Sequence, residues 1–369
     1  MRAVVAADEW GIIEKLLPVD WKAAARKHRA FRRARYIMEP GALLRALLFH
    51  AVNDAGLRET VAQLRASGVA ELSQVALLKR LRTAGDWLAW LGQELCAELR
   101  TQPRVPKAMR LRAVDSTTVQ GPASKGTDWR VHYTLNLTTL QCDWHELTDQ
   151  HGGESLKRVP VQAGDVLLGD RNFLHPMGVR AVVEAGGHVL VRLRWNHSAM
   201  QDGRGRPFQA LPHVRSLRVG TVGEWAVQLD DSQHVPIPGR VIATRLPAPL
   251  AARAERRVHR RASKLGYKRT DPRSIEAAHF VILFTTLPGE VLGADQVLEL
   301  YRYRWQIELA FKRLKQLLKI GRLPHQEVRA ARSWILAKLV VALLLEKLYR
   351  NASGFSPWGY RISRETDGP

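Results

Sequence analysis

The sequence contains very little cysteine, since Cys96 and Cys142 are the only two in 369 residues. They lie far apart and have neither a CxxC spacing nor a neighbouring group of histidines. Neither a disulfide framework nor a zinc site is therefore indicated. This cysteine usage is typical of a protein that works in a reducing cytoplasm.

Secretion and membrane signals are also lacking. Residues 1–17 contain acids within their apolar stretch and no small-residue cleavage pattern, so they do not predict a secretion signal. The apolar run 335–345 is interrupted by Lys338 and is too short to cross a bilayer. We expect a soluble protein without a membrane partner.

Acidic residues are scarce relative to basic ones. There are 57 Lys and Arg against 35 Asp and Glu, which gives a formal charge of +22 and a pI near 10.7. The charge is spread over several segments that also contain Trp and Tyr, which favours nucleic acid over membranes or acidic proteins as the polyanionic partner. The 46% of apolar residues suffices for a sizeable core, and the length predicts two or three domains.

Residues 1–105 are predicted to form an all-α domain that binds DNA. Segment 22–35 holds seven Lys or Arg and no acid, so it is either a phosphate-contacting element or an ordinary solvated helix or arm. A helix over 58–65, a turn at Gly68 and a second helix from about Ser73 suggest a helix-turn-helix, although many helical hairpins share this pattern. The second helix would offer Lys79 and Arg80 to DNA.

An alternating α/β pattern follows and contains two acids at predicted strand ends. After a linker at 101–109, the run LRAVDSTTV predicts a buried strand that ends at Asp115, and DVLLGDRNF predicts another that ends at Asp170. Further strands are expected at 131–137, 143–147 and 188–194, with a helix over 177–185. A single Asp after a strand is more often a turn or cap residue than a ligand. Two at matching strand ends favour a metal site.

Residues 195–278 are predicted to form an inserted β-rich subdomain with a basic tail. Short strands punctuated by Gly and Pro are followed by a dense basic helix, whose arginines include Arg256, Arg257, Arg260 and Arg261. We expect these four to bind DNA. A strand over 279–287 then resumes the core.

The spacing Y-x2-R-x3-E-x6-K places Tyr301, Arg304, Glu308 and Lys315 in a helical pattern with no Pro or Gly before Gly321. On an unbroken helix the four side chains would fall within about 60° of one face. Glu308 would bind a metal ion while the phenol and the two cations hold phosphate oxygens. The alternative is a solvated helix face.

These motifs together resemble the DDE transposases of bacterial insertion sequences, specifically the insertion-sequence-4 group. The resemblance covers about residues 57–360 and includes VDSTTV, HELTDQHGGE, GDRNF, the Tyr-Arg-Glu-Lys spacing and RWQIELAFKRLK. It implies an α/β fold with a ribonuclease-H-like catalytic core at 106–194 and 279–325. Asp115, Asp170 and Glu308 would then bind two Mg²⁺ ions, for which Mn²⁺ would substitute. Three carboxylates are suitable hard-oxygen ligands for such ions.

The resemblance also implies partners and a reaction. The family cuts double-stranded DNA at transposon ends, often through a hairpin, and joins the 3′ ends to target DNA. We expect a homodimer in a synaptic complex, acting in the bacterial cytoplasm on the nucleoid. Trp195 or Trp225 would stack on a flipped base, whereas Trp305 is expected to pack against the core.

Two other hypotheses remain open, as does the state of the C-terminal region. A metal-dependent nuclease of the same fold would use the same acids, and a domesticated transposase or other regulator would bind DNA without cutting it. The C-terminal helical region, 326–369, is short for the family, so a truncated copy that retains the acids is a further possibility.

Overall fold

The computed structural model describes residues 5–34, 36–100, 109–124, 126–196, 200–230, 235–316, 318–321 and 323–352. The predicted linker is described only at Met109. Arg35 and residues 353–369, the last part of the predicted C-terminal region, lie outside the described residues. No helix in the described ranges is long and apolar enough to cross a membrane.

The N-terminal part is all helical, as predicted. Its helices are α1 (Val5–Leu16), α2 (Trp21–Lys27), α3 (Pro40–Val52), α4 (Leu57–Ala66) and α5 (Gln74–Arg100). Gly68 makes the turn after α4 with φ +67, and the Ser73 hydroxyl caps α5 by accepting from the Ala76 N–H at 3.2 Å. The helix–turn–helix succession is therefore present, and its binding to DNA stays a prediction.

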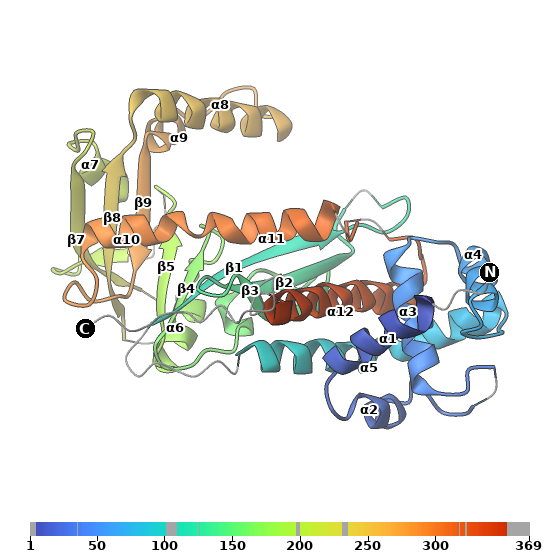
Figure 1. Ribbon diagram of the computed structural model, residues 1–369. Coiled ribbons are helices and arrows are strands. Elements are labelled where there is room, and N and C mark those ends of the chain that lie inside the picture. The colour runs from blue at the N-terminus through green and yellow to red at the C-terminus, as the bar shows by residue number, and fades with distance from the viewer. Residues whose placement is uncertain are drawn as a thin grey trace.

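One nine-stranded sheet runs through the described residues, in the order β3-β2-β1-β4-β5-β9-β8-β7-β6 (Figure 1). The first five strands are β1 (Arg110–Val119), β2 (Trp129–Asn136), β3 (Gln141–Asp149), β4 (Asp165–Gly169) and β5 (His188–Arg192). β1, β2 and β3 are antiparallel neighbours, while β4 is parallel to both β1 and β5. The short helix η1 (Leu156–Arg158) and α6 (Pro176–Glu184) connect them.

Helices cover both faces of this sheet because its central strands are apolar on both sides. In β4, Val166 and Leu168 join one hydrophobic cluster with Val297 and Leu300, and Leu167 joins another with Val179 of α6. Since strand residues alternate between faces, a continuous apolar run predicts burial on both. The described structure is a mixed α/β fold around one large sheet.

The predicted insertion contributes strands to the same sheet. It contains β6 (Met200–Asp202), α7 (Ala210–Val214), β7 (Val222–Leu229), β8 (Ile237–Arg245), α8 (Ala248–Lys264) and α9 (Pro272–Ala278). β7 and β8 are antiparallel, and β8 pairs with β9 (Phe280–Thr285), which in turn pairs with β5. The short antiparallel strands were thus predicted correctly, while the boundaries 195–278 of a separate subdomain stay a prediction.

The C-terminal helices are α10 (Ala294–Arg302), α11 (Trp305–Gln316) and α12 (Val328–Ala352). α12 packs along α5 and α3. The prediction of one unbroken helix up to Gly321 is wrong, because turns at Tyr303 and Arg304 separate α10 from α11, and α11 ends at Gln316. The Arg304 N–H donates to the Tyr301 carbonyl, three residues back, at 3.1 Å. Such a bond closes a smaller turn than the α-helical bond, which reaches four residues back.

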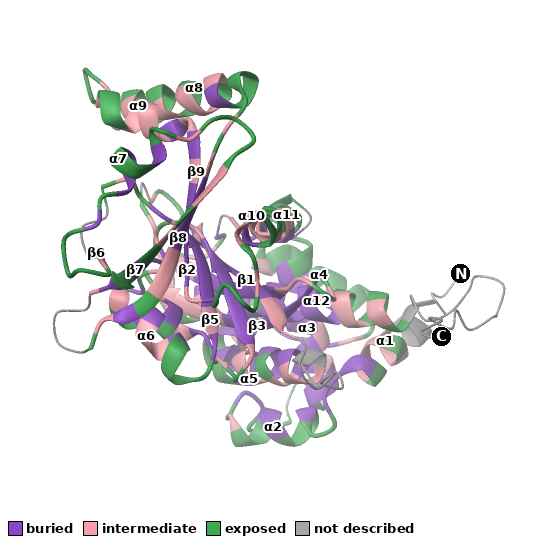
Figure 2. Cartoon of the chain, turned by 90° about the vertical axis from the view of Figure 1, so that its left-hand side faces the viewer, coloured by how far each residue is buried: buried purple, intermediate pink, exposed green. Residues whose placement is uncertain are grey.

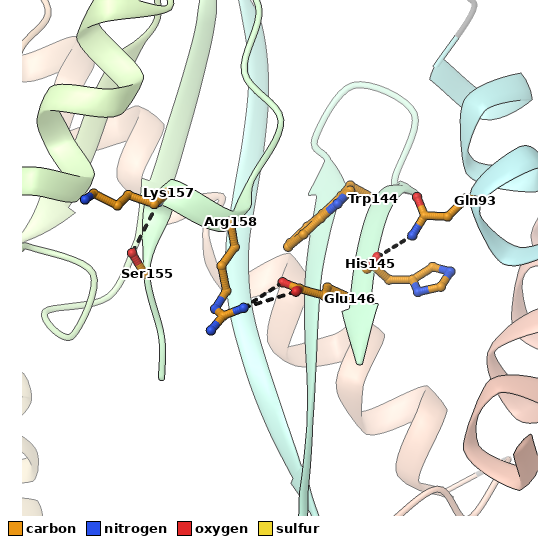
Figure 3. Close-up of a pocket in the computed structure, with 7 residues that line it drawn as sticks. All are labelled: Gln93, Trp144, His145, Glu146, Ser155, Lys157 and Arg158. Atoms are coloured by element: carbon orange, nitrogen blue, oxygen red, sulfur yellow. Dashed lines mark hydrogen bonds and ion pairs between the residues drawn. The ribbon is translucent and has the colours of Figure 1, made fainter. Parts of the chain in front are cut away.

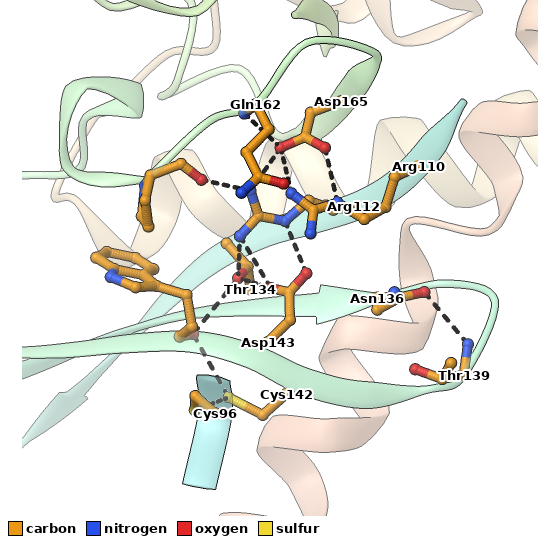
Figure 4. Close-up of polar contacts among 12 residues, drawn as sticks. Cys96, Arg110, Arg112, Thr134, Asn136, Thr139, Cys142, Asp143, Gln162 and Asp165 are labelled. Carbon is orange, nitrogen blue, oxygen red and sulfur yellow. Dashed lines mark hydrogen bonds and ion pairs between the residues drawn. The ribbon is translucent and has the colours of Figure 1, made fainter. Parts of the chain in front are cut away.

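A buried ion network fixes the start of β1 to its neighbours (Figure 4). Arg112 has no exposed surface, and its guanidinium donates to Asp143 at 2.8 and 2.9 Å, to Asp165 at 3.1 Å and to the Pro160 carbonyl at 2.7 Å. Arg110 donates two further bonds to Asp165, at 2.7 and 2.6 Å. Each buried charge therefore has an opposite charge and well-formed hydrogen bonds, which burial of an ion pair requires.

Candidate active site

Asp115 and Asp170 lie side by side on neighbouring parallel strands. β1 and β4 pair through Ala113 and Leu168, and each Asp stands two residues further along its own strand direction. Neighbouring strands are about 4.8 Å apart, and residues two apart share a face of the sheet. Both carboxylates therefore lie on the face that α10 and α11 cover.

Only one of the two acids ends its strand. Asp170 follows β4 directly, as predicted, and its Oδ1 accepts from the Asn172 N–H at 2.7 Å. The prediction that the first strand ends at Asp115 is wrong, because β1 continues to Val119 and stays paired with β2. Asp115 instead marks the point at which β1 extends beyond its partner β4, which leaves that side of the strand open.

The Asp115 carboxylate is poorly compensated. Its pKa is raised to about 6, first by burial and also by the neighbouring Asp170 and Glu154, although the Ser116 N–H at 2.7 Å and Arg304 act in the opposite direction. Desolvation and like charges both disfavour a carboxylate anion. A cation bound here would relieve both effects.

Tyr301 and Arg304 attach the helices to this end of the sheet. The Tyr301 hydroxyl donates to the Gly169 carbonyl at 3.1 Å, immediately before Asp170. The Arg304 guanidinium lies 5.8 Å from the centre of the Tyr301 ring. Burial is the largest influence on the pKa of Arg304 and lowers it. Tyr301, Glu308 and Asp115 together outweigh burial, so the pKa of Arg304 is raised.

Glu308 reaches the site through Arg304. Its Oε1 accepts from the Arg304 guanidinium at 2.6 Å, and its side chain is 59% exposed. Arg304 interacts electrostatically with both Glu308 and Asp115, so it joins the third predicted acid to the first. Within the described ranges, no three or more His, Cys, Asp or Glu residues come together as a ready metal-binding group.

Lys315 lies away from these groups. It stands seven residues beyond Glu308 on α11, about 10 Å along the helix axis. There it lines a pocket of about 500 Å³ together with Asp54, Lys319 and Trp334. The structure thus brings together Asp115, Asp170, Tyr301, Arg304 and Glu308, and puts Lys315 at the far end of the helix.

The other predicted DNA-binding residues lie on two separate helices. Arg256, Arg257, Arg260 and Arg261 are all exposed on α8, which stands out from the molecule beyond β8 and β9 (Figures 1 and 2). On α5, Lys79 is exposed, but the Arg80 guanidinium bonds to the Arg33 carbonyl at 3.1 Å and lies 5.9 Å from the Phe31 ring centre. Arg80 thus attaches the basic segment 22–35 to α5.

The tryptophans differ from expectation in one case. Trp305 is 48% exposed at the start of α11, so the prediction that it packs in the core is wrong. Trp195 and Trp225 are both half-buried against the hydrophobic cluster around β7 and α7. Trp195 also lies under the guanidinium of Arg273, 4.8 Å from its ring centre.

Two residues near the acids, Glu154 and Arg192, were not predicted as site residues from the sequence. Glu154 influences Asp115 and accepts from the Ser116 hydroxyl at 2.6 Å, and Arg192 ends β5 beside β4 and influences Tyr301. Glu154 ends the stretch HELTDQHGGE, which resembled the family, but its position beside Ser116 depends on how the chain folds back after β3. Arg192 lies within the predicted strand 188–194, but its position beside β4 depends on the pairing of β5 with β4.

A pocket of about 700 Å³ elsewhere contains none of the predicted residues (Figure 3). It lies along β3 and η1 and is lined by Gln93, Trp144, His145, Glu146, Ser155, Lys157 and Arg158. Arg158 is paired with Glu146 there at 3.0 and 3.1 Å.

Comparison with known proteins identifies the family of the chain. Residues 106–344 match the family described as the transposase DDE domain. The chain belongs to the DDE transposase family. The putative transposase InsL for insertion sequence element IS186A from Escherichia coli (strain K12) is 34% identical over 357 residues, 95% of this chain and 96% of that protein. The transposase for insertion sequence element IS421 from Escherichia coli is likewise 34% identical, over 95% of this chain and 96% of its own length.

Among solved structures, a piggyBac transposase synaptic complex with hairpin DNA matches with a TM-score of 0.48 and 12% identity. The match covers 93% of this chain and 73% of that one. The predicted resemblance to DDE transposases is confirmed by the family match and the two relatives. The chain is an insertion-sequence transposase of a family that performs phosphoryl transfer on nucleic acid and generally uses divalent metal ions.

Proposed function

We propose that this transposase binds the ends of its insertion sequence, cleaves them by metal-dependent phosphoryl transfer and joins the 3′ ends to target DNA. The observation that carries the proposal is the pair of carboxylates, Asp115 and Asp170, on adjacent strands beside Arg304 and Glu308. Paired carboxylates at one edge of a sheet are suited to bind the ions that catalyse phosphodiester cleavage. A structural role alone would not favour a half-buried anion next to another anion.

The donor set fits divalent ions of the magnesium type. Asp115, Asp170 and Glu308 would supply oxygen ligands. The pKa of Asp115 is raised first by burial and also by Asp170, so a cation bound there would stabilise the ionised form. Two Mg²⁺ ions, or Mn²⁺ in their place, would activate the attacking oxygen and stabilise the leaving one. Glu308 would have to exchange its bond with Arg304 for an ion.

The chain's own residues then position the DNA. Release from Glu308 would free the Arg304 guanidinium, which is suited to bidentate contact with a phosphate. Tyr301 would hold α10 against Gly169 and so keep Arg304 over the acids, and Lys315 would meet a phosphate further along α11.

A ribonuclease-H-like core is supported by the order and directions of β1 to β5, in which three antiparallel strands are followed by two parallel ones. The core would consist of residues 106–194 and 279–325, with the segment 195–278 inserted before Glu308. We further propose a DNA hairpin intermediate, a homodimer in a synaptic complex and action on the bacterial nucleoid in the cytoplasm, as the family resemblance implies. Trp195 and Trp225 remain the proposed partners for a flipped base.

The test uses a duplex made from the DNA that flanks the coding sequence of this chain. With Mg²⁺, end-specific nicks and joined products are expected, and Asp115→Asn should remove both. Mn²⁺ should support the same reaction. Random cuts would instead indicate a nuclease, and binding without cleavage would indicate a regulator or an inactive copy.

A further inference from the structure

Four arginines from three parts of the chain lie near Asp170. Arg171 follows Asp170 in the chain, Arg192 ends β5, Arg194 comes two residues later, and Arg261 is on α8. Arg171 interacts electrostatically with Asp170 and with the other three arginines. Positive charge thus exceeds negative charge at this point.

Hydrogen bonds help to hold this group in place. The Asn172 N–H donates to Asp170 at 2.7 Å, and its side-chain oxygen accepts from the Arg194 guanidinium at 2.6 Å. Arg194 is therefore oriented by the same turn that orients Asp170. Four cations are more than one carboxylate needs, so the group fits a further anion.

The helix α8 presents a cationic face that continues this group. Its six basic residues fall within about 140° of one face at α-helical spacing, and all are exposed: Arg253, Arg256, Arg257, Arg260, Arg261 and Lys264. The opposite face holds Ala251, which is buried, and Glu255, which pairs with His279 at the start of β9. Burial of that face fixes which side of α8 turns outward.

The length of this face suits a DNA strand. From Arg253 to Lys264 the helix advances about 16 Å, whereas phosphates on one strand of B-DNA are about 3.4 Å apart along the axis. Roughly four or five phosphates can lie along it. Arg261, near its end, is the residue of α8 that interacts electrostatically with Arg171.

We propose that α8, Arg261, Arg171 and Arg194 form one phosphate-binding track that leads the strand to be cleaved to Asp170. The inference rests on the proposed function and makes it more specific, because it assigns α8 to the transposon end and not to the target DNA. It also gives Arg171 a positioning role immediately next to a proposed metal ligand.

Crosslinking tests the assignment of α8 directly. Cys96 and Cys142 have no exposed surface, so an Arg261→Cys thiol can be labelled selectively with a photoactivatable reagent. In complexes with the end duplex, crosslinks are expected on the cleaved strand within a few nucleotides of the nick. Crosslinks only to target DNA in the strand-transfer complex, or none while binding is intact, would overturn the proposal. Arg204→Cys, exposed in the loop after β6, is the control and should not crosslink at these nucleotides.

Salt dependence provides a second test that does not need catalysis. Binding of the end duplex is measured in a chelator, where log affinity falls with log salt in proportion to the number of phosphate contacts. Arg261→Gln and Arg171→Gln should each reduce the slope by about 0.9 and weaken binding about fivefold at 0.15 M salt. Arg261→Lys should restore the slope, and Arg204→Gln should leave it unchanged.

These outcomes separate the inference from the function on which it rests. If the parent chain nicks and joins ends while Arg261→Gln keeps the parent slope, the track is wrong and the transposase function stands. If the parent chain neither binds nor nicks the end duplex, the function itself is wrong. Arg261 is exposed, so its variants remain informative even if Arg171→Gln folds poorly.

Discussion

Two charged regions three residues apart on β1 differ in how their charges are compensated. Arg112 is fully buried, but Asp143, Asp165 and the Pro160 carbonyl satisfy its guanidinium. At Asp115 negative charge predominates, since Asp170 and Glu154 add to it and the Ser116 N–H and Arg304 offset it only in part. The first region ties neighbouring strands of the sheet together, whereas the second leaves negative charge under-compensated, which supports the proposed metal site.

The strongest test of this difference is Asp115→Asn. We expect loss of end nicking and joining by at least about 10³-fold, or roughly 4 kcal/mol in the barrier. Stability should be unchanged or slightly higher, because a half-buried anion beside another anion is removed. Cleavage gels and thermal melting of the same preparations measure the two effects. A variant that loses activity only in proportion to its unfolding would contradict the proposed role.

The converse test is Asp143→Ala. This change leaves the Arg112 Nε and one of its terminal nitrogens without their carboxylate, so unfolding should become easier by about 3 kcal/mol or more. Urea unfolding measures this. Glu184→Gln is the matched control and should hardly move the midpoint, because the Glu184 side chain is 67% exposed and its separation from Arg180 is 4.0 Å. Equal effects of the two changes would show that the buried network contributes little.

Glu346 on α12 provides an intermediate case, a half-buried carboxylate held by neutral donors. Tyr133 donates to it at 2.9 Å and the Cys142 N–H at 2.8 Å, yet burial raises its pKa from 4.5 to about 7. Because the folded chain holds this proton more tightly than the unfolded chain, stability should fall as pH rises from about 4.5 through about 7 and then level off.

Glu346→Gln should remove this part of the pH dependence. At pH 8 the variant should be more stable than the parent by at most about 3 kcal/mol, and at pH 4 the two should be alike. Unfolding midpoints from pH 4 to pH 8 measure the difference. Parallel curves for the two proteins would show that Glu346 is ionised in the fold without cost.

The sequence predicted those parts of the site that local pattern determines. DVLLG is apolar on both faces and ends at Asp170, so the end of β4 could be placed from its residues alone. The continuation of β1 beyond Asp115 could not, because it depends on pairing with β2. The break at Tyr303 and Arg304 was also missed, since no Gly or Pro marks it. The break comes shortly after Tyr301, whose hydroxyl makes a long-range hydrogen bond to the Gly169 carbonyl.

The same bond gives the smallest and most specific prediction, for Tyr301→Phe. The ring remains beside Arg304, but the hydroxyl's hydrogen bond to Gly169 and its interaction with Arg304 are lost, which should lower stability by about 1 kcal/mol. If the hydroxyl serves mainly to hold α10 on β4, nicking should slow by less than about tenfold and the affinity for end DNA should stay unchanged.

Tyr303→Phe is the matched control for this change. Tyr303 is 56% exposed two residues away, so its loss of a hydroxyl should alter neither stability nor nicking. A Tyr301→Phe variant with parental stability but much weaker DNA binding would show that the hydroxyl contacts phosphate and does not anchor the helix. In that case only packing would hold α10 and Arg304 against β4. The region around Asp115 would then be less firmly positioned than the hydrogen-bonded network around Arg112.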